Sequence, residues 1–218
     1  MRDTMIISST GRGVTDVTIL RINNYVDARF SHTALLQHGA FLVDETPCEV
    51  IVTGASSACV HCPDAEAMDA LINEFRFYAE HITHFTDASG RTLRTFPPVE
   101  RFPVALADIQ PSQFFVDEDK LDAVLSFIHA PEDAVIPLIR HGDRFISLDG
   151  HTRMYAAHRL GFDHVTGFIA NHDDVILRFA EEAVCRGVRT PDQLELLSHE
   201  AYVIRWDGFC DRFFSNQP

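Results

Sequence analysis

Positive charge is scarce in this sequence. Its 218 residues include 18 Lys and Arg against 32 Asp and Glu, for a formal net charge of −14, and Lys120 is the sole lysine. Proteins that bind duplex DNA usually present a basic face, which displaces the counterions condensed on the phosphates. No cluster of Lys and Arg provides such a face here, so nucleic acid is disfavoured as the main partner.

Long apolar runs and a cysteine framework are also missing. No apolar stretch approaches the ~20 residues that cross a bilayer, and residues 1–9 lack the basic-then-apolar order of a secretory signal. Five cysteines are an odd number in a chain of this size, which argues against a full disulfide framework. We therefore expect a cytoplasmic protein with reduced thiols and no membrane partner.

What is present indicates a folded α+β protein. Hydrophobic residues make up 46% of the chain, an ordinary share for a soluble globular protein. Residues 1–98 mix strand-like and helical patterns, and Pro97-Pro98 cannot continue a regular ladder of backbone hydrogen bonds. Residues 99–170 alternate strands and helices, whereas residues 171–218 are helical. These three ranges are the predicted segments.

Hydrophobic periodicity and turn residues place the individual elements. We predict strands at 16–22, 40–43, 49–53, 58–61, 102–109, 135–140, 144–148 and 165–169. We predict helices at 63–79, 117–128, 152–160, 173–186 and 199–213, with Gly161 ending the third and a capping box at 190–193. Cys185 and Cys210 fall on predicted helices beside apolar residues, so we expect both in the core.

The last predicted helix carries an aromatic stripe. Tyr202, Trp206, Phe209 and Phe213 recur at helical spacing. Such a stripe usually packs into the core of its own chain. The alternative is a contact with a second copy of the chain, which leaves a homodimer open.

One turn has the features of an anion site. Residues 145–157 pass from strand to helix across a single glycine, Gly150. The first N–H groups of a helix lack internal partners, and the aligned peptide dipoles place partial positive charge there, a geometry that binds phosphate. Gly150 lets the backbone approach a ligand closely. Arg153 can hold phosphate oxygens with its planar fork, and Thr152 can donate a hydroxyl hydrogen bond.

Other residues of this turn have more than one interpretation. His151 and Arg153 are cations at a helix start, where they oppose the dipole unless an anion completes the site. Asp149 can hold Arg153, hold a metal-bound water or act as a base. In the plainer alternative, Asp149 caps the helix and pairs with Arg153 while His151 is solvated. We predict Asp149 and His151 as catalytic residues, and Gly150, His151, Thr152 and Arg153 as phosphate or nucleotide ligands.

The segment from Phe102 to Ile169 resembles the ParB/sulfiredoxin superfamily. It has the same order of strand, helix, paired strands, turn, helix and strand. The run Leu148-Asp149-Gly150-His151-Thr152-Arg153, followed by Tyr155-Ala156-Ala157, is similar to the family's Asp-Gly-x-x-Arg signature. The resemblance implies a ParB/sulfiredoxin-like core at 99–170, flanked by an N-terminal α+β unit and C-terminal helices. It also implies that this turn binds nucleotide phosphates.

Three departures limit the activity that the resemblance implies. Sulfiredoxins have a catalytic cysteine where this chain has His151. Chromosome-partitioning ParB proteins have a Gly-Glu-Arg-Arg motif and a following helix-turn-helix region, and this chain has neither. Free-serine kinases share Asp-Gly-x-x-Arg but have a glutamate base where this chain has Gln113. Asp117, Glu118 or Asp119 are the available substitutes, although acidic residues in a first helical turn are usually partners of the dipole.

Three functions therefore remain open. The leading hypothesis is binding of a nucleotide or phosphorylated small molecule at Asp149–Arg153, extended by phosphoryl transfer to a small acceptor if the protein is an enzyme. Mg²⁺ is the cofactor expected with a nucleotide, because it bridges phosphate oxygens. The alternative is a non-catalytic module that senses a ligand or contacts a protein, which Gln113 favours. ParB-like DNA binding or nuclease activity is the third, and the acidity argues against it.

A cysteine motif suggests a metal site of another kind. Cys59-Val60-His61-Cys62 has a spacing at which thiolates share zinc, and Cys48 is the further cysteine that could join it. A closed structural site needs four ligands, and no second Cys pair of this spacing exists. A coincidental pair in a strand-turn region is the favoured interpretation.

Overall fold

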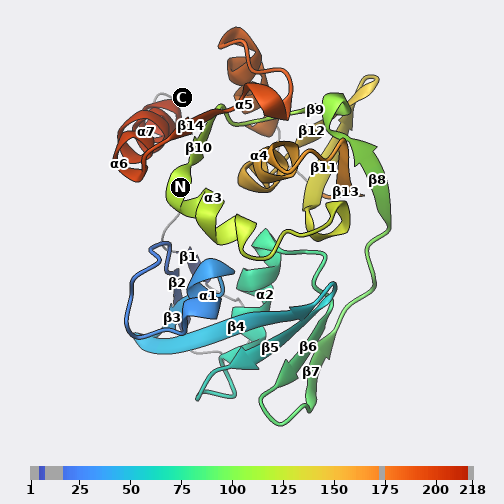
Figure 1. Ribbon diagram of the computed structural model, residues 1–218. Helices are drawn as coiled ribbons and strands as arrows, with labels where there is room; N and C mark the ends of the chain where they lie inside the picture. The colour runs from blue at the N-terminus through green and yellow to red at the C-terminus, as the bar shows by residue number, and fades with distance from the viewer. Residues whose placement is uncertain (1–4, 8–16, 172–174, 216–218) are drawn as a thin grey trace. The chain divides into compact units, whose positions relative to one another are not determined.

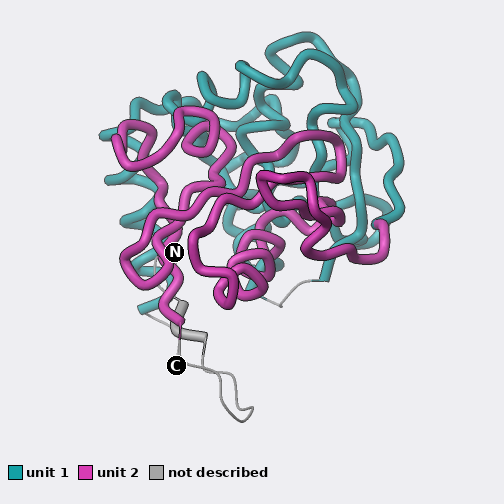
Figure 2. Tube along the Cα trace, turned by 90° about the horizontal axis from the view of Figure 1, so that it is seen from below, with its two compact units in different colours: residues 1, 99–218 teal, residues 2–98 magenta. Residues whose placement is uncertain are grey.

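The computed structural model describes residues 5–7, 17–171 and 175–215. The chain divides into two compact units, residues 2–98 and residues 99–218 (Figure 2). Each unit combines helices with a mixed sheet (Figure 1), so the protein is α+β. Within the described ranges, no helix is both long enough and apolar enough to span a lipid bilayer.

The sheet of the first unit follows the order of the chain. Its strands are β1 (Met5–Ile7), β2 (Val17–Arg21), β3 (Ala40–Val43), β4 (Thr46–Gly54), β5 (Ser57–His61), β6 (His84–Asp87) and β7 (Thr92–Thr95). Neighbouring strands are antiparallel except β5 and β6, which are parallel. The parallel pair needs a crossover connection, and helix α2 (Met68–Tyr78) supplies it. Short helix α1 (His32–Leu36) connects β2 to β3. Asp16, in the first predicted strand, lies outside the described residues.

Helix α2 starts later than predicted. The expected start at Pro63 is wrong, because the Asp64 carboxylate accepts a hydrogen bond from the Glu66 N–H at 2.9 Å and closes a turn there. From Met68 onward the chain is helical and buries its apolar face, as the periodicity predicts. Phe75 is buried, and its ring lies edge-on to Phe85 of β6 with centroids 6.2 Å apart.

The second unit contains a five-stranded sheet in the order β8-β13-β11-β12-β9. Its strands are β8 (Arg101–Ala105), β9 (Ile109–Gln110), β11 (Val135–His141), β12 (Arg144–Ser147) and β13 (His164–Ile169). The predicted single strand at 102–109 is wrong. A 3₁₀ turn at Leu106–Asp108, tied by the Leu106 N–H to the Asp163 carbonyl at 2.9 Å, divides it into β8 and β9 on opposite edges of the sheet.

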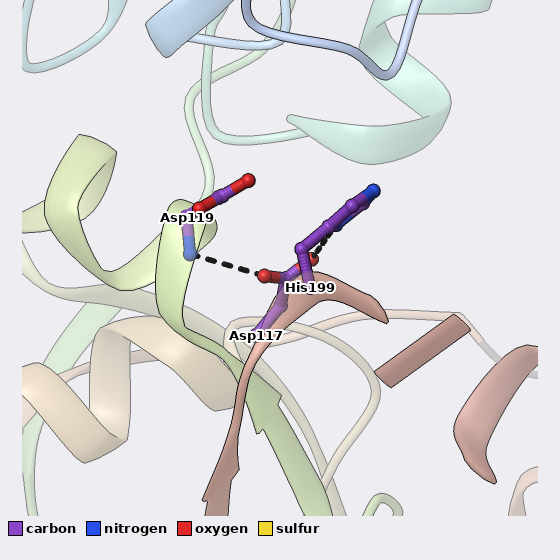
Figure 3. Close-up of side chains that lie close together, drawn as sticks. All are labelled: Asp117, Asp119 and His199. Carbon is purple, nitrogen blue, oxygen red and sulfur yellow. Dashed lines mark hydrogen bonds and ion pairs between the residues drawn. The ribbon is translucent and has the colours of Figure 1, made fainter. Parts of the chain in front are cut away.

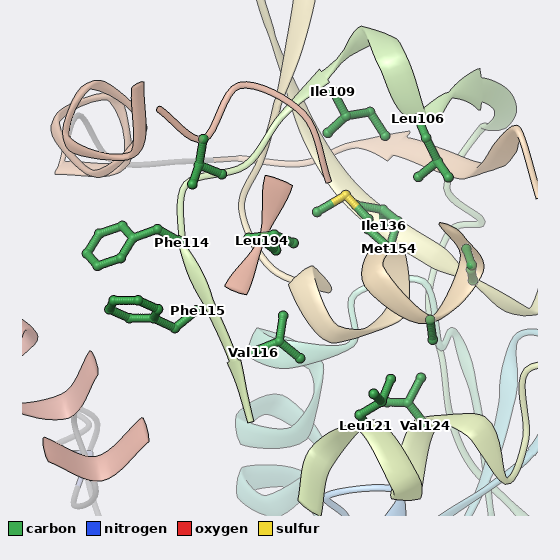
Figure 4. Close-up of a cluster of buried hydrophobic side chains, with 14 of the residues drawn as sticks. Leu106, Ile109, Phe114, Phe115, Val116, Leu121, Val124, Ile136, Met154 and Leu194 are labelled. Carbon is green, nitrogen blue, oxygen red and sulfur yellow. The ribbon is translucent and has the colours of Figure 1, made fainter. Parts of the chain in front are cut away.

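Helices α3 (Glu118–Leu125) and α4 (His151–Arg159) form where helical periodicity was found. Gly161 follows α4 with φ 81°, the left-handed conformation expected just after a helix end. Figure 4 shows Met154 of α4 beside Ile136, and Leu121 and Val124 of α3 pointing into the same buried cluster.

The C-terminal segment belongs to this second unit. Strand β10 (Phe115–Asp117) pairs in parallel with β14 (Glu195–Leu197), and neither strand was predicted from the sequence. The capping box forms, but over the 3₁₀ turn Pro191–Gln193 rather than a longer helix, because β14 begins two residues later. Helix α5 (Val175–Cys185) precedes it, and residues 173 and 174 of the predicted helix lie outside the described residues.

The last predicted helix is interrupted. It consists of α6 (His199–Tyr202), a π-helical turn (Val203–Asp207) and α7 (Gly208–Ser215). Its aromatic stripe packs within the chain: Trp206 is buried, with its ring centroid 4.9 Å from that of Phe114. Cys210 is buried as expected, but Cys185 is exposed at the end of α5, so its assignment to the core is wrong.

Candidate functional site

The turn at residues 149–153 is built around one glycine. Strand β12 ends at Ser147, and Gly150 then adopts φ 81° and ψ 19° as the N-cap of α4. A Cβ at this position would lie 2.7 Å from Cδ1 of Ile136 and 3.2 Å from Nη2 of Arg153. Both the left-handed backbone and the crowding therefore require glycine.

Helix α4 begins without a side-chain cap from its N-cap residue, because glycine has no side chain. Its first internal hydrogen bond runs from the Met154 N–H to the Gly150 carbonyl at 2.9 Å. The N–H groups of His151, Thr152 and Arg153 come before that bond. They lie at the positive end of the helix dipole, where anions are stabilised.

His151 points into the protein rather than out of the turn. Its Nε2 lies 3.2 Å from the Ser112 N, 3.1 Å from the Ser112 Oγ and 3.1 Å from the Ser147 Oγ. The backbone N–H of Ser112 can only donate, so Nε2 carries a lone pair. The Ser112 hydroxyl donates to the Ser147 carbonyl at 2.7 Å, which leaves the Ser147 hydroxyl as the second donor to Nε2. The ring is therefore the neutral tautomer with its proton on Nδ1.

Burial also keeps this imidazole neutral. Its residue is 6% exposed, and desolvation lowers the pKa of His151 to about 4. The alternative in which His151 is solvated is therefore wrong. The ring instead ties the loop at Ser112 to the end of β12. Its predicted roles in catalysis and phosphate binding stay predictions.

Arg153 and Asp149 form the polar rim of the turn. The Arg153 Nη1 donates to the Val135 carbonyl at the start of β11, and its Nη2 lies 3.4 Å from the Asp149 Oδ2. The Arg153 side chain is 18% exposed and that of Asp149 is 59% exposed. Thr152, between them in the chain, is half-buried. The guanidinium is thus anchored at one nitrogen and loosely paired at another, and the carboxylate faces solvent.

Gln113, which the sequence prediction aligned with the glutamate base of the free-serine kinases, has a structural role. Its side-chain amide donates to the Tyr202 hydroxyl at 3.1 Å and to the Phe115 carbonyl. The amide therefore links the segment before β10 to α6.

Asp117 is the buried member of the acidic group that follows Gln113. Its Oδ1 accepts a hydrogen bond from the Asp119 N–H at 3.0 Å and caps α3, and its Oδ2 lies 2.9 Å from the His199 Nδ1 (Figure 3). Strands β10 and β14 run in parallel, so Asp117, the last residue of β10, and His199, two residues after β14, lie at the same end of the pair. The hydrogen bond that the His199 Nδ1–H donates to the Asp117 carboxylate raises the pKa of His199 and favours the imidazolium.

Asp117, Asp119 and His199 also form a possible cation-binding group. One ligand atom from each lies within 4.8 Å of the others, and no other group of three such residues was found in the described part of the chain. A metal needs a neutral imidazole, so it would have to displace the proton that Asp117 stabilises on His199. Sequence reasoning named both aspartates but missed His199, because no local spacing connects residues 82 positions apart.

Comparisons with known proteins do not assign the chain to a family. No family model matches it, and no curated protein matches it. Among solved structures, protein Atu1540 from Agrobacterium tumefaciens is 14% identical, with a TM-score of 0.30, over 44% of this chain and 62% of that one. The match thus spans about three fifths of that protein's length.

The cysteine motif does not gather its side chains. Cys59 lies within β5 between Ala58 and Val60, whose side chains are on the buried face, so its own side chain points to the opposite face. Cys62 joins the buried face instead, where its Sγ lies 2.7 Å from the Sγ of Cys48. The cysteine pair and the turn at 149–153 lie in different units.

Proposed function

We propose that this protein binds a nucleotide or phosphorylated small molecule at the turn of residues 149–153. The observation that carries the proposal is the start of α4 at a left-handed Gly150 that no other residue could replace without strain. A phosphate placed there would accept hydrogen bonds from the first N–H groups of the helix and lie at the positive end of its dipole. Thr152 adds a hydroxyl donor.

Arg153 supplies the charge of the proposed site. Because His151 is neutral, the guanidinium is the full positive charge within the turn. Its bond to the Val135 carbonyl fixes the side chain, while the 3.4 Å separation from Asp149 is long for a charge-assisted hydrogen bond. A phosphate oxygen can therefore take Nη2 from the carboxylate without moving the rest of the arginine.

The element order of residues 99–170 supports a ParB/sulfiredoxin-like core, which we include in the proposal. The exposed carboxylate of Asp149 lies beside the proposed phosphate, where it could either bind a metal ion or act as a base. Mg²⁺ prefers oxygen ligands and is often held by one or two carboxylates together with substrate phosphates, so this carboxylate fits it. When bound, Mg²⁺ would neutralise phosphate charge. Alternatively, Asp149 would take the proton from an acceptor hydroxyl.

Thermal unfolding with a ligand panel tests the binding proposal. The panel is ATP, ADP, CTP, phosphate and pyrophosphate, each with and without Mg²⁺. A ligand at 100 times its dissociation constant adds about 2.7 kcal/mol, which raises the midpoint by several degrees at about 2–4 °C per kcal/mol. We expect Arg153→Ala to abolish the shift and Arg159→Ala, at the exposed end of α4, to preserve it. An equal shift in wild type and Arg153→Ala would refute the assignment.

A non-catalytic sensing module is the second candidate. The hydrogen bonds of Gln113 to Tyr202 and Phe115 favour it, since this amide has a fixed role in the fold and cannot accept a proton. A turnover assay with ATP or ADP and small hydroxyl acceptors separates the two functions. Product formation that is lost in Asp149→Asn supports phosphoryl transfer, whereas binding without product supports the module.

A further inference from the structure

Cys48 and Cys62 are brought together by the pairing of β4 with β5. Glu49 lies opposite His61 in this antiparallel pair, so the next positions outward are Cys48 and Cys62. Both side chains lie on the buried face, and their sulfurs are 2.7 Å apart. A disulfide bond is about 2.05 Å long, so the sulfurs need approach by only about 0.7 Å to form one.

The two cysteines differ in access. Cys48 is 1% exposed, whereas Cys62 is half-buried and lines an open pocket of about 570 Å³ beside Arg29, His61 and Met68. Cys62 also lies one residue beyond the end of β5, so it can shift without breaking the strand ladder. A small reagent can therefore reach Cys62 first, and the buried sulfur of Cys48 is the group placed to react second.

We propose that Cys48 and Cys62 are a redox-active pair that a low-molecular-weight disulfide oxidises to an intramolecular disulfide. Cys62 loses its proton and attacks one sulfur of the reagent, whose other half leaves as a thiolate. Cys48 then loses its proton and attacks the Cys62 sulfur, which releases the second thiolate. The two cysteines lose two electrons and two protons, and the reagent is reduced to two thiols.

The surroundings of Cys48 fit this order of attack. Burial and the neighbouring Cys62 thiol raise the pKa of Cys48, which donates its S–H to the Cys62 sulfur. A protonated thiol is a poor nucleophile, so Cys48 does not compete for the first step.

Incubation in reduced and oxidised glutathione, followed by alkylation, intact mass and peptide mapping, tests the proposal. In the wild type we expect residues 48 and 62 to escape alkylation and to be recovered as one linked peptide pair, two hydrogens lighter than the two separate peptides. Cys48→Ser should accumulate a glutathione adduct on Cys62, and Cys62→Ser should form neither this disulfide nor an adduct on Cys48. Cys59→Ser, on the opposite face of β5, is the matched control and should behave as wild type.

Peptide mapping of the oxidised wild-type protein tests the proposal without any variant, so the test does not depend on whether a variant folds. Exposed Cys185 reports that the oxidant is active, because it should form a glutathione adduct under the same conditions. If Cys48 and Cys62 are both recovered alkylated when Cys185 is fully modified, the proposal is overturned. A linked pair that includes Cys59 in place of either residue would overturn it as well.

Discussion

Replacing His151 with glutamine should make the stability of this protein less sensitive to acid. The imidazole is buried and neutral, and its pKa is lowered to about 4 from its ordinary value of 6.5. The unfolded chain therefore binds a proton on His151 near pH 6.5, and the folded chain binds it only near pH 4. Between these values the unfolded state holds more protons, so the free energy of unfolding falls as the pH falls.

The size of this effect follows from the two pKa values. Each unit of pKa difference corresponds to about 1.4 kcal/mol, so His151 should remove about 3 kcal/mol of stability between pH 6.5 and pH 4. Glutamine has a carbonyl that can accept from Ser112 and Ser147 but does not titrate. Alanine offers no acceptor, and each donor that it leaves buried and unpaired should cost about 1–3 kcal/mol at pH 7.

Urea unfolding, followed by Trp206 fluorescence at pH 7, 6, 5 and 4.5, measures these differences. The other titrating groups are the same in wild type and His151→Gln, so the difference between the two proteins isolates His151. We expect any deficit of the glutamine variant at pH 7 to shrink as the pH falls, and to reverse if it is small. A difference that stays constant from pH 7 to pH 4.5 would refute the reasoning about this buried ring.

Two other features lead to predictions of the same kind. Gly150→Ala should cost more stability than Gly161→Ala: both residues have φ 81°, but an added Cβ meets Ile136 at 2.7 Å at the first position and nothing within 4 Å at the second. Urea unfolding measures both costs, and equal costs would mean that the crowding at Gly150 relaxes freely. Asp117→Asn should lower the pKa of His199 in an NMR titration, because it removes the carboxylate that favours the imidazolium. The pairing stabilises the fold below the unfolded-state pKa of His199 and is lost as the pH rises through the raised folded-state value. Asp119→Asn should change that pKa less, since Asp119 contributes only a more distant charge.

Local signals predicted the elements around the turn. Apolar periodicity placed α4 and the paired strands before it, and Gly161 has the left-handed conformation that the residue after a helix end favours. The α+β class followed from the same patterns. These predictions succeed because each depends on residues within a few positions of one another.

The orientation of side chains in the site was harder to predict. A histidine in a first helical turn is usually solvated, and only the positions of Ser112 and Ser147 reveal why His151 turns inward. The pairing of Asp117 with His199 likewise needs the short parallel strands β10 and β14. Three-residue strands have too few positions to show an alternating pattern.

The pairing of β10 with β14 has a consequence for the folding of the second unit. A ribosome makes Phe114 and Asp117 long before it makes Trp206 and His199, their partners in the ring cluster and the ion pair. Until residues 195–206 emerge, Phe114 lacks its native contact with Trp206 and Asp117 lacks its ion pair with His199. Contacts of such long sequence separation form late and slow folding. Residues 195–206 therefore close the core of the second unit, and that unit can complete its folding only after they have left the ribosome.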